Sequence, residues 1–206
     1  MNDVFAPPII SLTALHREET RCRRCDLYRD ATQVVPGEGS TSAALMLVGE
    51  QPGDSEDRAG KPFVGPAGHI LDRALAEAGI RREKAFVTNA VKHFKHELRG
   101  KRRLHKRPDA GEIQACRWWL DLERGLVRPS VIVALGATAA RGVLGRAVTI
   151  AKVRDVTEAL ADGTRVRVTI HPSLLLRLRG ETEKISEYGR FVGDLREAAA
   201  LAGLAV

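Results

Sequence analysis

The sequence predicts an α/β fold of three layers, with helices on both faces of a central parallel sheet of four strands. Four short apolar segments alternate along the chain with segments whose apolar residues have helical spacing, as in successive strand–helix units. The apolar segments are continuous, which is typical of strands buried on both faces. The chain has 206 residues, of which 44% are hydrophobic and only 4% aromatic, so we expect residues 1–206 to form one domain with a mainly aliphatic core.

The expected elements follow from these patterns and from the residues that end them. Strands are expected at residues 43–49, 85–89, 131–136 and 165–170. Helices are expected at residues 11–25, 67–79, 109–126, 137–144 and 182–202, and the second of these ends at Gly79. Residues 1–10 are expected to form a loose arm, residues 148–160 an irregular region or a hairpin, and residues 92–108, which lack apolar periodicity, a long loop.

The charge of the chain favours a polyanionic partner. Lys and Arg number 33 against 26 Asp and Glu, which gives a net charge of +7, and the pI is about 9.7. Residues 92–107, KHFKHELRGKRRLHKR, hold eight Lys or Arg and one acidic residue, Glu97. Such a segment neutralises phosphates, so we expect it to bind nucleic acid in a salt-dependent way. We find no apolar stretch that could cross a bilayer and no signal peptide, and therefore expect a cytoplasmic monomer without membrane contacts.

The three cysteines are Cys22, Cys25 and Cys116. An odd number that includes a Cys-x-x-Cys pair argues against a disulfide framework and favours metal ligation in a reducing compartment. The spacing of Cys22 and Cys25 is typical of half a metal site. The fourth ligand is open at this point, since the sequence offers His16, His93 and His96. Zinc and an iron–sulfur cluster both suit three cysteines and one histidine.

Polar residues and a glycine follow the predicted strands at the points where the strands end. Glu50, Asn89, Gly136 and His171 each lie at or just past the carboxyl end of a strand. The carboxyl ends of parallel strands meet at one edge of a sheet, and ligands bind beyond that edge. The sequence therefore predicts a binding or catalytic site built from four separate segments.

The first of these segments is GEQPG, in which Glu50 lies next to Gly49. The glycines let the backbone approach a ligand, and the carboxylate, or a water that it holds, can face the reaction centre. Asp54 and Asp57 follow Glu50 after four and seven residues. Downstream, prolines and glycines flank Phe63, and an aromatic ring held in this way can stack on a flat heterocycle.

Two further residues can recognise and activate a base. The amide of Asn89 offers both a donor and an acceptor, which match the edge of a base such as uracil. His171 can donate a hydrogen bond to an oxygen on which negative charge develops. Taken singly, Phe63, Asn89 and His171 are each more often structural residues. Their position at one predicted edge is what favours a site.

Together these segments resemble the iron–sulfur uracil-DNA glycosylases, and most closely the UdgX class among them. The resemblance extends over roughly residues 15–200 and implies a three-layer fold with a four-stranded parallel sheet and a [4Fe–4S] cluster. The motifs that carry it are GEQPG at 49–53, GKPFVGPAG at 60–68, TNAVKHFK at 88–95, KRRLH at 101–105, CRWWL from Cys116, LGATAA at 135–140 and HPS at 171–173.

The departures from the typical family pattern are as informative as the matches. Typical members hold the cluster with four cysteines, and this chain has His93 in place of the third, so the resemblance implies Cys22, Cys25, His93 and Cys116 as ligands. Gln51 replaces the alanine of the common GEAPG motif. The KRRLH insertion is absent from ordinary members, and its histidine, His105 here, is implied to attack the deoxyribose after uracil leaves. A histidine among many cations can keep a neutral imidazole with a free lone pair, as a nucleophile needs.

The resemblance implies an enzyme that excises uracil from DNA, single-stranded DNA at least, and stays covalently joined to the abasic site through His105. The implied catalytic residues are His105, Glu50, Gln51 and His171. The implied substrate-binding residues are Phe63, Asn89, Gly49, Asp54 and Asp57. The implied DNA contacts are Lys101, Arg102, Arg103, Lys106 and Ser173. The alternatives are a conventional iron–sulfur glycosylase that hydrolyses and turns over, or a non-catalytic module that binds damaged DNA.

Overall fold

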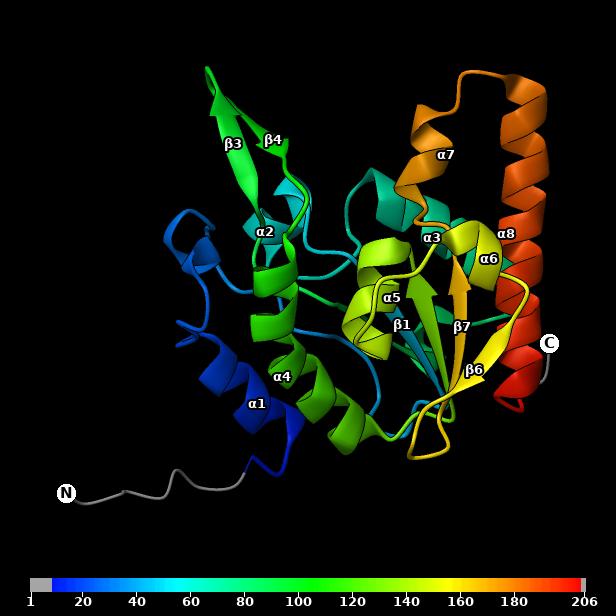
Figure 1. The fold of residues 1–206 in the computed structure, drawn as a ribbon, viewed down its shortest axis with the longest axis horizontal. Helices are drawn as coiled ribbons and strands as arrows, with labels where there is room; N and C mark the ends of the chain where they lie inside the picture. The colour runs from blue at the N-terminus through cyan, green and yellow to red at the C-terminus, as the bar shows by residue number, and fades with distance from the viewer. Residues whose placement is uncertain (1–8, 205–206) are drawn as a thin grey trace.

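The computed structural model describes residues 9–204 and contains a five-stranded sheet in the order β2-β1-β5-β7-β6 (Figure 1). Four strands are parallel, and β6 pairs antiparallel with β7 at one edge. The strands are β1 (Leu45–Gly49), β2 (Ala85–Asn89), β5 (Val131–Leu135), β6 (Thr157–Ala159) and β7 (Arg165–Thr169). The expected four parallel strands are confirmed, and residues 148–160 supply the additional edge strand.

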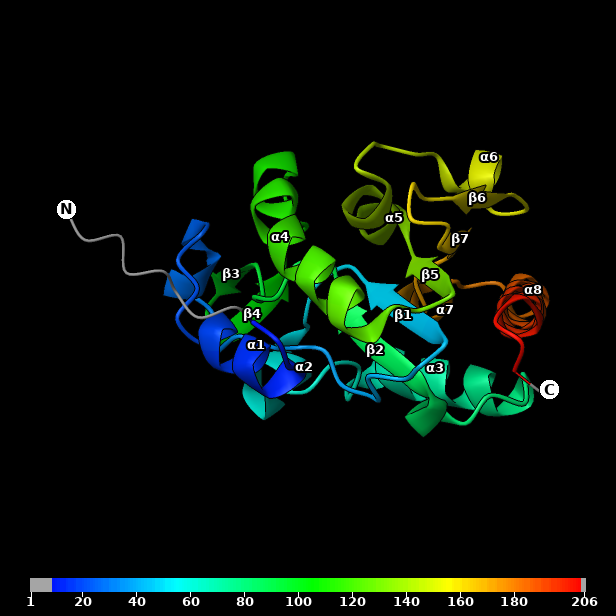
Figure 2. The same cartoon turned by 90° about the horizontal axis from the view of Figure 1, so that it is seen from below.

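Helices cover both faces of the sheet (Figure 2). One face packs against α3 (Pro66–Glu77) and α8 (Glu181–Leu201), and the other against α4 (Ala110–Val127) and α5 (Ala137–Leu144). Alternate residues of the buried strands belong to the two sides, so the expected three-layer α/β architecture is confirmed. None of the helices within residues 9–204 combines the length and apolarity needed to cross a membrane.

Several short elements differ from the expected boundaries. The helix expected at 11–25 is α1 (Leu12–Glu19), capped by the Ser11 hydroxyl, and it ends before the Cys-x-x-Cys pair. The expected arm, residues 1–10, lies almost entirely outside the described residues. The short helices that sequence patterning does not predict are α2 (Asp54–Ala59), α6 (Ile150–Val153), α7 (Ser173–Arg177) and two 3-10 turns at Asp26–Arg29 and Arg82–Lys84.

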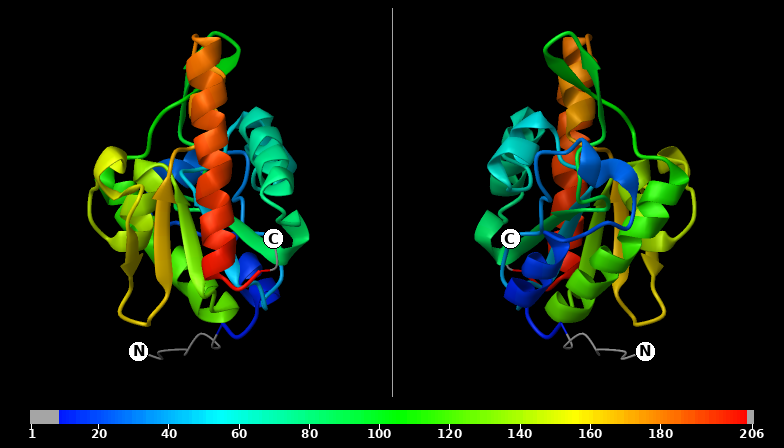
Figure 3. Two further views of the ribbon diagram at one scale, coloured as in Figure 1. Left: turned by 90° about the vertical axis from the view of Figure 1, so that its right-hand side faces the viewer. Right: turned by 90° about the vertical axis from the view of Figure 1, so that its left-hand side faces the viewer.

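The expectation of a long loop at 92–108 is wrong. The segment contains an antiparallel hairpin of β3 (His96–Arg99) and β4 (Arg102–His105), with Gly100 at a positive φ of 62° in the turn. The hairpin projects beyond the carboxyl edge of the main sheet (Figures 1 and 3). Its residues are mostly charged and partly or fully exposed, so it lacks the apolar alternation by which a half-buried strand is recognised.

Close packing of α3 on the loop before it predicts a strong effect of a single methyl group. A Cβ atom at Gly68 would lie 1.9 Å from the carbonyl oxygen of Phe63. We expect Gly68→Ala to lower the free energy of unfolding by about 1–3 kcal/mol, as overpacking does. Equilibrium urea unfolding measures this.

Gly189 provides the matched control. It lies in α8, where an added Cβ meets nothing within 4 Å. Gly189→Ala should therefore raise the free energy of unfolding by about 0.5–1 kcal/mol, because alanine is the better helix former. A Gly68→Ala variant as stable as the wild type would contradict the close approach of α3 to Phe63.

Candidate active site

A cavity of about 580 Å³ opens at the carboxyl edge of the sheet. Glu50, Asn89 and His171, which follow three different strands, all line it, as the sequence predicts. The remaining lining residues are Gln51, Gly53, Asp54, Ser55, Glu56, Phe63, Pro66, Ala67, His105, Ser173, Leu176 and Arg177. The parallel pairing of the strands is what brings these segments together.

Asn89 has a buried amide without a protein partner. Its side chain is 1% exposed, and neither its oxygen nor its nitrogen has a hydrogen-bond partner among the described residues. A buried polar group left unpaired costs about 1–3 kcal/mol. An amide in this state is prepared to pair with a ligand that offers one donor and one acceptor on the same edge.

Phe63 is held close to Asn89 by the shape of the backbone. Phe63 has a φ of 56°, a conformation that non-glycine residues rarely adopt, and its ring is buried at the cavity wall. A Cβ atom at Gly49 would lie 2.3 Å from Asn89 Oδ1 and 2.5 Å from Phe63 Cζ. Only glycine therefore lets the amide and the ring share this space at the end of β1.

His171 is a neutral hydrogen-bond donor. Its Nδ1 accepts the backbone N–H of Ser173 at 3.2 Å and lies 2.8 Å from the Ser173 hydroxyl, so the ring proton is on Nε2. Burial lowers the pKa of His171 to about 4, and the carboxylate of Glu50 offsets this only in part. The ring of Phe63 stacks on His171 with centroids 6.0 Å apart.

Glu50 and His105 meet at the mouth of the cavity. Glu50 Oε1 lies 3.2 Å from His105 Nε2, and Thr138 donates a hydrogen bond to Oε2 at 2.5 Å. Burial alone would raise the pKa of Glu50, but the hydrogen bonds from His105 and Thr138 outweigh it and hold the pKa below its usual value. The imidazole of His105 is 49% exposed, so it can reach a ligand that enters from solvent.

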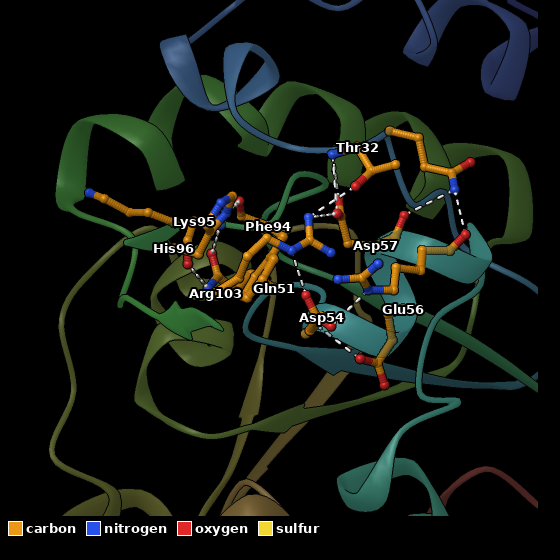
Figure 4. Close-up of polar contacts among 12 residues, drawn as sticks. Thr32, Gln51, Asp54, Glu56, Asp57, Phe94, Lys95, His96 and Arg103 are labelled. Atoms are coloured by element: carbon orange, nitrogen blue, oxygen red, sulfur yellow. Dashed lines mark hydrogen bonds and ion pairs between the residues drawn. The ribbon is translucent and has the colours of Figure 1, made fainter. Parts of the chain in front are cut away.

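Arg103 anchors the hairpin to the body of the protein (Figure 4). Its Nε lies 2.5 Å from Asp54 Oδ1, and its Nη1 lies 2.6 Å from Asp57 Oδ2. The Arg103 side chain is only 12% exposed, and it also binds the Thr32 hydroxyl. One cation thus lies between two carboxylates, and Asp54 still lines the cavity. The expectations that Arg103 contacts DNA and that Asp54 and Asp57 contact substrate stay predictions.

Gln51 fixes the base of the same hairpin. Its Nε2 donates to the carbonyl oxygens of Lys95 at 3.1 Å and Lys106 at 3.0 Å, and its Oε1 accepts the N–H of Lys95 at 3.0 Å. One amide thus binds both chains of the hairpin where they leave the body. Gln51 thus holds the strand that carries His105, and its expected role in catalysis stays a prediction.

Other cations of this segment differ in their exposure. Lys101, Arg102 and Lys106 are exposed on the hairpin, where phosphates can reach them, and Lys106 pairs with Glu97 at 2.9 Å. Lys92 differs from the other members of the basic segment, because it is 1% exposed and its Nζ lies 2.6 Å from Glu123. Lys92 therefore contributes nothing to a phosphate-binding surface.

The three cysteines lie together at the junction of α1 and α4. Cys22, Cys25 and Cys116 pack in one apolar cluster. The indole N–H of Trp119 donates to Cys22 Sγ at 3.0 Å, and the backbone N–H of Lys92 donates to Cys116 Sγ at 3.2 Å. Burial raises the pKa of the Cys116 thiol to about 12, so a strong positive charge such as that of iron is needed to hold it as a thiolate.

The histidines expected as alternatives for the fourth ligand lie in different surroundings. His93 is buried, and burial lowers its pKa to about 4, which leaves a neutral imidazole able to bind a metal. His96 belongs to β3 and stacks on Phe94 with centroids 5.0 Å apart. His16 lies in α1, and burial lowers its pKa as well. The donor chemistry of Cys22, Cys25, His93 and Cys116 fits an iron–sulfur cluster.

Within residues 9–204, no three His, Cys, Asp or Glu side chains converge closely enough to hold a single metal ion. The assignment of a metal group to Cys22, Cys25, His93 and Cys116 therefore stays a prediction.

Comparison of the sequence with known proteins agrees with this geometry. Residues 36–196 match the family model of the uracil DNA glycosylase superfamily. The chain belongs to this superfamily. A type-4 uracil-DNA glycosylase of Thermotoga maritima is 41% identical over 160 residues, which are 77% of this chain and 80% of the relative. A type-4 enzyme of Pyrobaculum aerophilum is 36% identical over 187 residues, 85% of this chain and 91% of the relative. The resemblance to the UdgX class stays a prediction.

The structure also shows two residues of the site that the sequence analysis did not single out. Thr138 follows the third parallel strand and binds Glu50, and its signal was its place two residues after Gly136 at a strand end. Arg177 lines the cavity from α7 and donates to the Ser173 hydroxyl at 3.2 Å. The HPS motif indicates where the segment that contains α7 begins, but it gives no signal for Arg177.

The environment of His171 predicts its titration. We expect NMR titration of the ring to give a pKa near 4 and to show the Nε2–H tautomer at neutral pH, because burial disfavours the charged form. An unfolded histidine takes up its proton near pH 6.5. Stability contributed by this group is therefore complete above about 6.5 and is lost as the pH falls toward 4.

His171→Gln assigns the resonance and serves as the control for both measurements. A titration midpoint near 6.5 in the folded wild type, or the Nδ1–H tautomer, would contradict the buried neutral donor.

Proposed function

We propose that this chain excises uracil from DNA and that His105 then captures the sugar. The observation that carries the first part is the unpaired amide of Asn89 beside the ring of Phe63. The observation that carries the second part is the contact of His105 with Glu50 at the cavity mouth. Membership of the uracil DNA glycosylase superfamily supports the excision step.

Recognition begins when the nucleotide leaves the base stack and its base enters the cavity. Phe63 stacks on the base, and the Asn89 amide pairs with O4 and N3–H of uracil. Cytosine presents an amino group and an unprotonated ring nitrogen on this edge, so it mismatches the Asn89 amide in the orientation that pairs with uracil. A buried unpaired group costs about 1–3 kcal/mol, which is the basis for rejecting cytosine.

The glycosidic bond from C1′ to N1 then breaks, and its electron pair leaves with the base as a uracil anion. The Nε2–H of His171 donates to the O2 side of this anion, where charge develops. The ionised Glu50 carboxylate stabilises the positive charge on the sugar. A neutral His171 suits this role, because its hydrogen bond stabilises the departing anion without transferring a proton to the base.

Capture by His105 completes the proposed reaction. A lone pair on one ring nitrogen forms the bond to C1′, and the imidazole becomes an imidazolium whose other nitrogen keeps its proton. Because Glu50 is an ionised acceptor, it stabilises that imidazolium. The hydrolytic alternative, in which water attacks C1′ and the enzyme turns over, uses the same base-binding residues and differs only in the nucleophile.

The adduct is tested directly on a denaturing gel. We expect wild-type protein mixed with uracil-containing single-stranded DNA to give a band that resists boiling in SDS, and His105→Ala to give none. Released uracil is measured in parallel. Free abasic product with many turnovers and no shifted band supports the hydrolytic alternative, and absence of uracil release supports a module that only binds DNA.

The anchoring of the hairpin predicts a separate effect of Arg103. Arg103→Ala leaves the carboxylate of Asp57 buried without its cation and frees the strand that carries His105. A misplacement of about 1 Å costs on the order of 100-fold in rate, so we expect adduct formation to slow by about this factor while uracil release falls less.

Arg102→Ala is the matched control, because Arg102 is exposed in the same strand. Its loss should weaken DNA binding and lower the slope of log affinity against log salt by about 1, without changing the ratio of adduct to released uracil. Equal ratios for Arg103→Ala and wild type would contradict the anchoring role.

We also propose that Cys22, Cys25, His93 and Cys116 hold a [4Fe–4S] cluster. When bound, the cluster supplies a rigid cross-link between the Cys-x-x-Cys segment, the segment after β2 and α4. We expect the protein to be brown, with visible absorbance and about four irons per chain. His93→Ala should lose most of its iron, whereas His96→Ala should keep it. Full iron in His93→Ala would contradict the ligand assignment.

A further inference from the structure

Arg107 lies two residues after His105, where the second strand of the hairpin returns to the body of the protein. Its backbone is held on both sides. The carbonyl oxygen of the preceding residue, Lys106, accepts a hydrogen bond from Gln51, and the residue that follows, Pro108, is buried. A residue before proline is restricted to extended backbone conformations. The start of the Arg107 side chain is therefore fixed close to the proposed nucleophile.

The guanidinium group of Arg107 sets the direction in which the Thr138 hydroxyl donates. Thr138 is 2% exposed, and Arg107 Nε donates to its Oγ1 at 3.0 Å. Arginine has no acceptor, so the hydroxyl proton cannot point back at the guanidinium group. That proton is donated to Glu50 Oε2, which lies 2.5 Å from Oγ1. A hydroxyl proton otherwise rotates to suit its surroundings, and Arg107 removes that freedom.

Both oxygens of the Glu50 carboxylate are therefore engaged. Oε1 lies 3.2 Å from His105 Nε2, and Oε2 accepts the hydrogen bond from Thr138. Arg107 Nε itself is 3.8 Å from Oε2, and the Arg107 side chain is 64% exposed. Solvent screens a charge that is exposed to this extent. The hydrogen-bonded route through Thr138 is therefore the stronger connection between Arg107 and Glu50.

The state of Glu50 affects two nucleophiles that compete for the sugar cation. Attack by His105 forms the bond from nitrogen to C1′ with a lone pair and requires no proton to be removed. Attack by water forms the bond from oxygen to C1′ and releases a proton, which a carboxylate can accept as general base. Burial would raise the pKa of Glu50, but the hydrogen bonds from His105 and Thr138 hold it below its usual value. Glu50 is therefore a poor base for water.

We propose that Arg107, acting through Thr138, holds the Glu50 carboxylate against His105 and so directs the sugar cation to the imidazole instead of to water. This inference rests on the proposed function, because it concerns how the same reaction divides between two nucleophiles. Arg107 and Thr138 are positioning residues. Each acts on the reaction through Glu50, and neither needs to touch the sugar or the base.

The division between the two nucleophiles is measured in single-turnover reactions with saturating uracil-containing single-stranded DNA. The measured value is the ratio of adduct to free abasic product on a denaturing gel. We expect Thr138→Val, which keeps a similar shape without the hydroxyl, to lower this ratio about tenfold, as loss of a hydrogen bond to a charged group does. Arg107→Gln should lower the ratio by a smaller factor of about three, because the hydroxyl remains but is no longer directed. Thr138→Ser, which keeps the hydroxyl, should lie much closer to the wild type than Thr138→Val.

A double variant separates action through Thr138 from a direct effect of the Arg107 charge. In a Thr138→Val background there is no hydroxyl to direct, so Arg107→Gln should cause no further loss. Arg81→Gln controls for the removal of one positive charge. Arg81 is exposed and pairs with Glu83 at 3.5 Å, so its substitution should leave the ratio unchanged.

Titration of the Glu50 carboxyl by ¹³C NMR gives a second measurement, which needs no DNA. The pKa of Glu50 should rise in Thr138→Val, because a hydrogen bond that favours the ionised form is lost. It should rise less in Arg107→Gln. A pKa that stays the same in Thr138→Val overturns the inference, because the hydroxyl would then not hold the carboxylate.

The outcomes on DNA separate this inference from the proposed function. A wild type that forms the adduct, with equal ratios in Thr138→Val and Arg107→Gln, overturns the inference alone. Full additivity of the two substitutions also overturns it, since Arg107 would then act independently of Thr138. A wild type that releases uracil and forms no adduct overturns the proposed capture by His105, and this inference with it.

Discussion

The ammonium group of Lys92 ties together the parts of the molecule on which the site depends. Its Nζ donates to Glu123 at 2.6 Å, to the Thr88 hydroxyl at 2.5 Å and to the carbonyl oxygen of Asn89 at 3.0 Å. Its backbone N–H reaches the sulfur of Cys116. One buried residue thus connects the end of β2, helix α4 and the cysteine cluster through its side chain and its backbone N–H. Removing one member of a buried ion pair costs about 3–5 kcal/mol, since the other charge is left uncompensated.

The proposed base recognition and the proposed metal ligation therefore share a support. Asn89 presents its amide from the residue whose carbonyl oxygen Lys92 holds, and Lys92 is followed directly by His93. Movement of the cysteine cluster would reach the cavity through this short segment. The proposed reaction has no redox step, so the role of the proposed cluster would be to fix the backbone that carries the amide.

Much of the fold followed from the sequence, because continuous apolar strands and strand-end residues are strong local signals. Glu50, Asn89 and His171 came together as expected, since parallel pairing leaves no other edge for them. The hairpin was not predicted, because its strands are rich in charged residues and lack the alternation of apolar and polar residues that indicates a half-buried strand. The inward orientation of Arg103 was also invisible, because a count of cations does not reveal which of them meet a buried carboxylate such as Asp57. The partners of Gln51 lie 44 and 55 residues away in sequence, beyond any local pattern.

Apart from Thr32, the side chains that hold the hairpin come from one short stretch, since Gln51, Asp54 and Asp57 all belong to the turn after β1 and to α2. The hairpin and the residues that hold it are therefore separate in sequence but form a single unit. Grafting residues 96–105 alone onto a relative would leave the transplanted strands without the amide and the two carboxylates that fix them. A functional chimera must therefore exchange the hairpin together with the segment that carries Gln51, Asp54 and Asp57. Transfer of the histidine alone would not be enough.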